Sequence, residues 1–132
     1  MSTPYTLLLV DDDADDRELF LLALKRLGEE EFTCQTANDG PEALRKLSGG
    51  AVQPDIIFLD LNMPLMNGNE VLQQLKSQEE TRDIPVVILS TASDAHTIAQ
   101  ARQLGACNFF SKPMKVGDWS SMLRSAMSAI AA

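Results

Sequence analysis

Short apolar runs alternate along the chain with segments of helical periodicity, and this alternation limits the fold more than any other feature of the sequence. Three runs, 5–10, 55–60 and 85–90, are dominated by apolar residues. They are too short for typical helices and have the length and composition of strands buried on both faces. Two weaker runs, 32–37 and 107–111, fit strands at the edges of a sheet. The sequence therefore predicts five strands.

Helix signals follow each predicted strand. Acidic side chains within 13–16 suit the positive end of a helix that ends at Gly28. Pro41 suits the first turn of a second helix, and apolar residues within 71–75 mark a third. A fourth helix is expected from about 94 to 104. The last segment carries one apolar stripe at helical spacing, made of Trp119, Met122, Leu123, Ala126, Met127 and Ile130.

Strict alternation of strand and helix predicts a parallel sheet with right-handed crossovers and helices on both faces. Five such units fit a flavodoxin-like (βα)5 fold, a three-layer α/β sandwich with strand order 2-1-3-4-5. Ligands in such sheets bind at the carboxyl ends of the strands, beside the first and third strands. With 132 residues, 45% of them apolar, we expect one domain over 1–132, a core within about 5–130 and no output domain.

The charge of the chain excludes several classes of partner. It has 11 basic and 19 acidic residues and a formal net charge of −8 at pH 7. This charge repels phosphate backbones and anionic lipids, so we expect neither nucleic acid nor membrane among the partners. The first residues lack the basic region and long apolar stretch of a signal peptide, and the apolar runs are short. The sequence therefore predicts a cytoplasmic protein.

Polar side chains follow the buried strands where each strand ends. Asp11 and Asp12 come after the first predicted strand, Asp60 ends the third, Ser90 ends the fourth and Lys112 follows the fifth. Two unit charges about 4 Å apart repel by roughly 4 kcal/mol at an effective dielectric near 20, so three convergent carboxylates require a cation or an unusual protonation state. Carboxylate oxygens favour Mg²⁺ over zinc, and Mg²⁺ keeps positions open for a phosphoryl oxygen. The site therefore predicts phosphoryl chemistry.

Four separated motifs carry a resemblance to a known family. They are Val10-Asp11-Asp12, then Leu59-Asp60-Leu61-Asn62-Met63-Pro64 with Gly68, then Ser90-Thr91-Ala92, and finally Gly105-Ala106 with Lys112-Pro113. In this order, from about residue 6 to about residue 128, the chain resembles the receiver domain of two-component response regulators, and in particular a stand-alone, chemotaxis-regulator-like receiver. Each motif is common by itself, but the coincidence of all four on the expected strands is specific.

The resemblance implies a role for each residue of the acidic site. Asp60 would accept a phosphoryl group. Asp12 would bind Mg²⁺ directly and Asp11 would help, mostly through water, while Asp60 and the backbone carbonyl of Asn62 would complete the protein ligands. The resemblance also implies that Mn²⁺ can replace Mg²⁺. Lys112 would place its ammonium group against the phosphoryl oxygens, a point-charge role that lysine fills well.

The resemblance also implies how phosphorylation is sensed and how long it lasts. The Ser90 hydroxyl would bind the phosphorylated aspartate, and Phe109 would swing inward behind it. Asn62 and Ala92 stand where receiver domains tune dephosphorylation, and neither offers an acid or a base. The resemblance further implies a cis peptide bond at Lys112-Pro113.

The implied function is that of a stand-alone response regulator in a phosphorelay. It would take its phosphoryl group from a sensor histidine kinase or a histidine phosphotransfer protein, and it would assist its own Mg²⁺-dependent phosphorylation and dephosphorylation without being an enzyme in the ordinary sense. A downstream protein target, or a second copy of the chain as a homodimer, would read the surface formed by 94–104, 107–111 and the last helix.

Two alternatives remain open at this point. A Mg²⁺-dependent phosphatase that forms an aspartyl phosphate generally carries a second acid two residues after the nucleophile, where this chain has Asn62. A phosphorylation-independent, receiver-like binding module typically lacks the acceptor or the acid pair. This chain retains Asp60, the acid pair and Lys112.

Overall fold

The five predicted strands form one parallel sheet. The computed structural model describes residues 5–28, 32–50, 52–91 and 94–131. The strands are β1 (Tyr5–Val10), β2 (Phe32–Ala37), β3 (Ile56–Asp60), β4 (Val86–Ser90) and β5 (Asn108–Ser111). All neighbours pair in parallel, in the order β2-β1-β3-β4-β5. The predicted α/β fold and strand order are confirmed.

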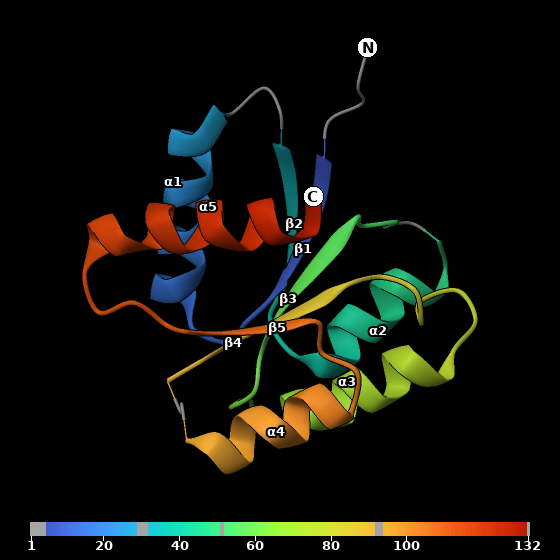
Figure 1. The fold of residues 1–132 in the computed structure, drawn as a ribbon. Coiled ribbons are helices and arrows are strands. Elements are labelled where there is room, and N and C mark those ends of the chain that lie inside the picture. Colours follow the sequence, from blue (N-terminus) through green and yellow to red (C-terminus); the bar gives the residue numbers. More distant parts are fainter. Residues whose placement is uncertain (1–4, 29–31, 51, 92–93, 132) are drawn as a thin grey trace.

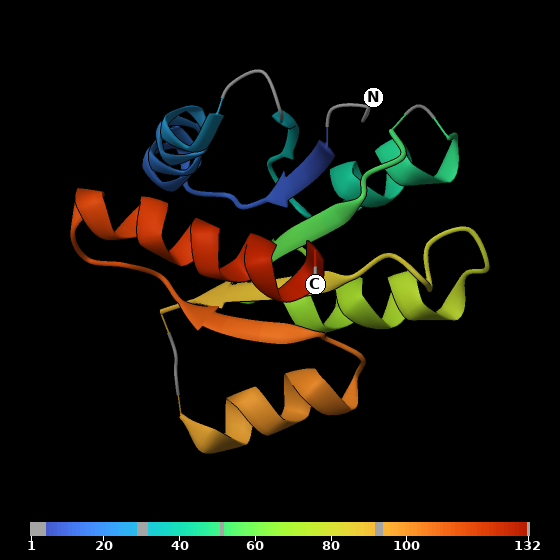
Figure 2. The same cartoon turned by 45° about the horizontal axis from the view of Figure 1, so that its top comes forward.

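Five helices cover the two faces of the sheet. They are α1 (Ala14–Gly28), α2 (Gly40–Ser48), α3 (Gly68–Ser77), α4 (Ala95–Gln103) and α5 (Val116–Ala131). Helices α1 and α5 lie side by side on one face, while α2, α3 and α4 lie on the other (Figure 1). Figure 2 shows β5 between α5 and α4. Among the described residues, no helix is long and apolar enough to span a membrane.

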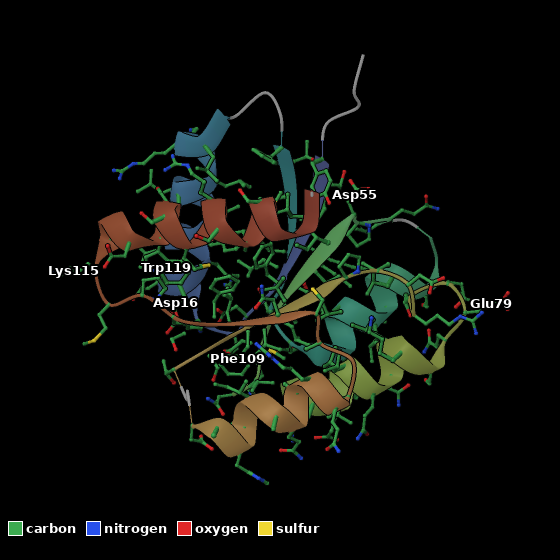
Figure 3. The ribbon with its side chains drawn as sticks, in the orientation of Figure 1. Asp16, Asp55, Glu79, Phe109, Lys115 and Trp119 are labelled. Atoms are coloured by element: carbon green, nitrogen blue, oxygen red, sulfur yellow. The ribbon has the colours of Figure 1, made fainter. Side chains whose placement is uncertain are left out.

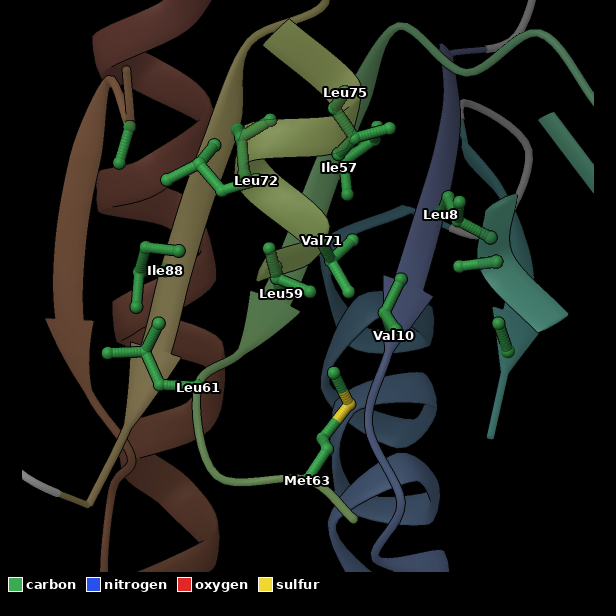
Figure 4. Close-up of a cluster of buried hydrophobic side chains, with 14 of the residues drawn as sticks. Leu8, Val10, Ile57, Leu59, Leu61, Met63, Val71, Leu72, Leu75 and Ile88 are labelled. Atoms are coloured by element: carbon green, nitrogen blue, oxygen red, sulfur yellow. The ribbon is translucent and has the colours of Figure 1, made fainter. Parts of the chain in front are cut away.

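The side chains of the central strands alternate between two hydrophobic clusters, as the pleat of a strand requires. On the face covered by α2, α3 and α4, the strand residues Leu8, Val10, Ile57, Leu59 and Ile88 pack against the helices (Figure 4). On the other face, Leu7, Leu9, Ile56, Phe58 and Leu89 pack against α1 and α5. The strands β3 and β4 are buried along their whole length, whereas β2 and β5 are only partly buried. This difference matches the predicted central and edge positions.

Local chemistry explains where the helices begin and end. The Asp13 carboxylate accepts hydrogen bonds from the N–H groups of Asp15 and Asp16, so it caps α1. Asp39 caps α2 in the same way. After α4, Gly105 has φ +113°, a left-handed conformation that glycine adopts without steric cost.

The apolar stripe of the last segment lies on α5 and faces the sheet. Trp119, Met122, Leu123 and Ala126 are buried among residues of α1 and the central strands. Met127 is partly buried at the edge of the same cluster. The side chain of Ile130, also assigned to the stripe, lies outside the described residues. Packing on the sheet therefore accounts for the described part of the stripe.

Gly68 allows α3 to approach the end of β3 closely. Its N–H donates to the Leu61 carbonyl at 2.9 Å. A Cβ atom at this position would lie 2.5 Å from the Asp60 carbonyl oxygen and 2.6 Å from the Leu61 Cα. Because both of these atoms belong to the backbone, any larger residue would have to displace either α3 or the segment that carries Asp60.

Candidate functional site

Three carboxylates converge at the carboxyl ends of β1 and β3. Each of Asp11, Asp12 and Asp60 offers one carboxylate oxygen to this group, and the three oxygens lie within 4.8 Å of one another. Asp11 is 1% exposed and Asp60 is 4% exposed, while Asp12 is open to solvent. The parallel register, which pairs Val10 with Leu59, brings the residues just after β1 to the level of Asp60, the last residue of β3. The predicted convergence is confirmed.

The ammonium group of Lys112 inserts among the carboxylates from the segment after β5. Lys112 Nζ lies 2.9 Å from Asp11 Oδ2 and 3.3 Å from Asp60 Oδ2. A third carboxylate, Asp16 Oδ2 in the first turn of α1, lies 2.8 Å from the same nitrogen. The backbone N–H of Lys112 donates to the Ser90 carbonyl at 2.9 Å, which anchors this segment to the end of β4.

The proton affinities of the site follow from burial and from an excess of negative charge. Burial raises the pKa of Asp60 from 3.8 to about 6, and the charge of Asp11 acts in the same direction, whereas Lys112 and the N–H of Asn62 oppose the rise. Burial alone would lower the pKa of Lys112, but its hydrogen bonds to Asp16 and Asp11 raise it above the ordinary value. The lysine is therefore charged at neutral pH, and the carboxylates around it outnumber it.

Asn62 and Ser90 border the Asp60 carboxylate. The N–H of Asn62 donates to Asp60 Oδ1 at 3.2 Å, which orients the carboxyl group. The Asn62 side-chain nitrogen lies 3.5 Å from Ser90 Oγ, a long contact. Ser90 is buried at the end of β4, the strand next to Asp60. The hydroxyl, amide and carboxyl groups that the sequence predicted to act together thus lie on one edge of the sheet.

The sequence that forms this site matches the model of a known protein family. The family model of the response regulator receiver domain matches residues 7–124. The chain is a response regulator receiver domain. This match covers β1 from Leu7 onward, the other four strands and the acidic site, and receiver domains of this family are signalling phosphoacceptors rather than ordinary enzymes.

Individual relatives of this receiver domain include curated proteins and solved structures. The chain is 35% identical to the probable methanogenesis regulatory protein FilR2 of Methanothrix harundinacea, over 87% of the chain and 76% of FilR2. It is 30% identical to the phosphate regulon transcriptional regulatory protein PhoB of Pseudomonas aeruginosa, over 92% of the chain but only 51% of PhoB. The chain thus spans about half of PhoB.

Among the solved structures, similarity extends over nearly whole chains. The phosphorylated cyanobacterial phytochrome response regulator RcpA superposes with a TM-score of 0.87 at 29% identity, over 94% of this chain and 91% of that one. The Mn²⁺-bound form of response regulator Rcp1 superposes with a TM-score of 0.84 at 28% identity, over 95% of this chain and 93% of that one. Both similarities agree with the observed fold.

Phe109, the proposed switch aromatic of the receiver domain, is partly buried on β5. It packs against the hydrophobic cluster on the α2, α3 and α4 face. Figure 3 shows Phe109 on the α4 side of β5 and Asp16 on the α1 side. Ala92, predicted to tune dephosphorylation, lies outside the described residues.

The predicted cis bond at Lys112-Pro113 is wrong. Among the residues that the structure describes, no peptide bond is cis. The trans form of a bond before proline is favoured by about 0.5–1 kcal/mol, and the cis form accounts for only about 5–6% of such bonds in folded proteins. The trans bond is thus the form that the local chemistry favours.

Two residues of α1 belong to the receiver site although the sequence patterns did not single them out. Asp16 contacts Lys112. Arg17 donates from Nη1 to the Asp11 carbonyl at 2.8 Å and ties α1 to the end of β1. In the sequence, only their position in the first turn of the helix after the acid pair could have indicated this role. That turn lies close to the carboxyl ends of the strands, where the site is.

Proposed function

We propose that the chain accepts a phosphoryl group on Asp60 from a sensor histidine kinase or a histidine phosphotransfer protein and then controls a protein partner in a phosphorelay. The observation that carries this proposal is the placement of Asp60, which lies beside the acid pair, with the Lys112 ammonium 3.3 Å from its Oδ2. The net charge of −8 favours a protein partner over nucleic acid.

The residues around Asp60 suit a nucleophilic role for its carboxylate. A carboxylate oxygen would attack the phosphorus of phosphohistidine; the new O–P bond forms as the P–N bond breaks, and the leaving imidazole nitrogen takes a proton. Asn62 would hold the carboxylate in one orientation through its N–H. Lys112 would offset the negative charge on the phosphoryl oxygens.

The donor set of the site fits a divalent cation. The carboxylates of Asp11, Asp12 and Asp60 converge beside the Lys112 ammonium group, and carboxylate oxygens are the ligands that Mg²⁺ and Mn²⁺ prefer. Asp11, Asp12 and Asp60 would hold the ion together with the backbone carbonyl of Asn62. When bound, it would supply positive charge that offsets the charge of the incoming phosphoryl group. The Mn²⁺-bound form of the similar regulator Rcp1 supports this assignment.

Incubation with acetyl phosphate and Mg²⁺ tests the proposal directly. We expect the intact mass of the wild type to rise by one phosphoryl group, and we expect no rise for Asp60→Asn, because an amide oxygen cannot form the aspartyl phosphate. Asp83→Asn is the matched control, since Asp83 is exposed in the connection between α3 and β4. This control should gain the same mass as the wild type.

Three results would contradict the proposal. Absence of any added mass in the wild type would favour a phosphorylation-independent binding module. An added mass that persists in Asp60→Asn would place the acceptor elsewhere. Rapid catalytic turnover of acetyl phosphate, with activity toward other phosphate esters, would favour the phosphatase alternative.

We also propose that the phosphoryl group acts through Ser90 and Phe109 on the surface formed by α4, β5 and α5. Ser90 ends β4, and Phe109 on the neighbouring strand β5 pairs with Ile88, two residues before Ser90, so a displacement at the end of β4 can reach Phe109. A few kcal/mol between two conformations suffices for such a switch. A protein target or a second copy of the chain would read this surface. The rate of phosphoryl loss would be set in part by Asn62 and Ala92.

Amide NMR spectra of the free and the phosphorylated protein check this route. We expect shifts at Asp60 to be accompanied by shifts along α4, β5 and α5. Shifts confined to the surroundings of Asp60 would refute the route while leaving the phosphoacceptor role intact.

We further propose that the protein acts as a single-domain regulator, with the cytoplasmic location expected from the sequence. The chain covers 91% of RcpA and 93% of Rcp1 in the solved structures, which supports this assignment.

A further inference from the structure

One carboxylate in contact with Lys112 has no part in the reaction proposed above. Asp16 Oδ2 lies 2.8 Å from Lys112 Nζ, closer than the oxygens of Asp11 and Asp60. Asp16 belongs to α1, whereas the other two carboxylates follow β1 and end β3. It does not belong to the group of described carboxylates that converge on the metal position. Its contact is therefore with the lysine.

The ammonium group of Lys112 can donate only a limited number of hydrogen bonds. A lysine ammonium carries three N–H donors, and here three carboxylates lie within 3.3 Å of it. A phosphoryl group on Asp60 would add further acceptor oxygens next to the same nitrogen. For Lys112 to bind them, one of the present contacts has to lengthen or break.

Solvent exposure determines which contact is the least costly to give up. The side chain of Asp16 is 24% exposed, against 2% for Asp11 and 6% for Asp60. A released Asp16 carboxylate can bind water in place of the ammonium, whereas a released Asp11 would remain a buried charge that keeps only the hydrogen bond from the Asp13 N–H, which is far more unfavourable.

We propose that Asp16 is a positioning residue that competes with the phosphoryl group for Lys112 and so limits how readily Asp60 is phosphorylated. This inference rests on the proposed phosphoacceptor function. The negative charge of Asp16 also disfavours phosphorylation of Asp60, because it repels an incoming phosphoryl group near Lys112. Removal of the Asp16 charge therefore favours phosphorylation of Asp60 in two ways: it ends the competition for Lys112 and it removes this repulsion.

Rates of phosphorylation by acetyl phosphate at saturating Mg²⁺ test the inference. We expect Asp16→Asn to react about fivefold faster than the wild type, which corresponds to about 1 kcal/mol at 25 °C. Asp16→Glu keeps a carboxylate within reach of Lys112 and should return the rate to near that of the wild type. An unchanged or slower rate in Asp16→Asn, or equal acceleration in Asp16→Glu, would overturn the inference.

Asp15→Asn is the matched control. Asp15 lies in the same helical turn, is exposed, and loses the same charge on substitution. We expect the rate of this variant to equal that of the wild type. Acceleration by Asp15→Asn as large as that by Asp16→Asn would show that overall charge, and not the contact with Lys112, sets the rate.

A second measurement reports on the contact itself in the metal-free protein. The ¹⁵Nζ resonance of Lys112 should shift in Asp16→Asn and stay in place in Asp15→Asn. If the wild type gains no phosphoryl group, the proposed function is wrong and this inference is wrong with it. If the wild type reacts and all variants react at the same rate, only the inference about Asp16 is wrong.

Discussion

Asp60→Asn is expected to make the metal-free protein more stable at pH 7.5, by roughly 1–3 kcal/mol. The reason is that the folded protein disfavours the ionised form of Asp60, whose pKa burial raises from 3.8 to about 6. Asparagine resembles the protonated carboxyl group in shape and charge. Lys112 keeps Asp11 and Asp16 as partners in the variant, so no buried charge is left without a partner.

The pH dependence of this effect has a defined sign. Well below pH 3.8, Asp60 is protonated in both the folded and the unfolded chain, and its ionisation contributes nothing to the free energy of unfolding. As the pH rises from about 4 to about 6, the unfolded chain loses the proton before the folded protein does, so the wild type loses stability. The loss is complete once the pH lies well above the folded-state pKa of about 6. Asp60→Asn has no ionisable group at this position, so its free energy of unfolding should change less with pH.

Urea unfolding in the presence of EDTA, at pH values from 4 to 8, measures the difference. Asp83→Asn is the control because it removes one exposed aspartate and should follow the wild type at every pH. Equal stability of Asp60→Asn and wild type at pH 7.5 would mean that Lys112 fully compensates the buried charge. A stabilisation that persists unchanged at pH 4 would also contradict the explanation.

The unfavourable burial of negative charge at this site links the stability of the protein to its proposed function. The residues that would bind a cation and a phosphoryl group are held close together at a cost to the folded protein, since the carboxylates of Asp11, Asp12 and Asp60 converge while Asp11 and Asp60 share the Lys112 ammonium group with Asp16. A bound cation or a covalently attached phosphoryl group brings new partners to this site. The instability of the free site is therefore part of what makes it receptive.

The acidic site could be predicted from the sequence because strand ends define it. The apolar runs that end at Val10 and at Asp60 specify two buried parallel strands, and neighbouring parallel strands end at one edge of the sheet. The positions of Asp11, Asp12 and Asp60 then follow from the backbone alone. No side-chain detail is needed to bring them together.

Other features depend on packing that periodicity does not encode. The contact of Asp16 with Lys112 requires the orientation of α1 relative to the segment after β5, and the two residues are 96 positions apart. The cis and trans forms before Pro113 differ by only about 1 kcal/mol in an isolated chain, so tertiary context decides between them. A sequence pattern shared with a family therefore did not predict the observed trans bond.

Gly68→Ala is expected to reduce the free energy of unfolding by about 3 kcal/mol, at the upper end of the usual cost of overpacking. The added Cβ would lie 2.5 Å from the Asp60 carbonyl oxygen and 2.6 Å from the Leu61 Cα. Neither atom can move without the backbone at the end of β3, so α3 would have to shift outward. Urea or thermal unfolding of the variant measures the loss.

Gly117→Ala is the matched control, because Gly117 also lies in the first turn of a helix and its Cβ would meet no atom within 4 Å. That variant should be as stable as the wild type or up to about 1 kcal/mol more stable, since alanine favours the helix. Equal effects of the two substitutions would contradict the steric explanation. If the explanation is right, the backbone that carries Asp60 is displaced in Gly68→Ala alone, and its phosphorylation by acetyl phosphate should slow under conditions where the variant remains folded. The glycine of the motif is then required for the placement of the acceptor as well as for stability.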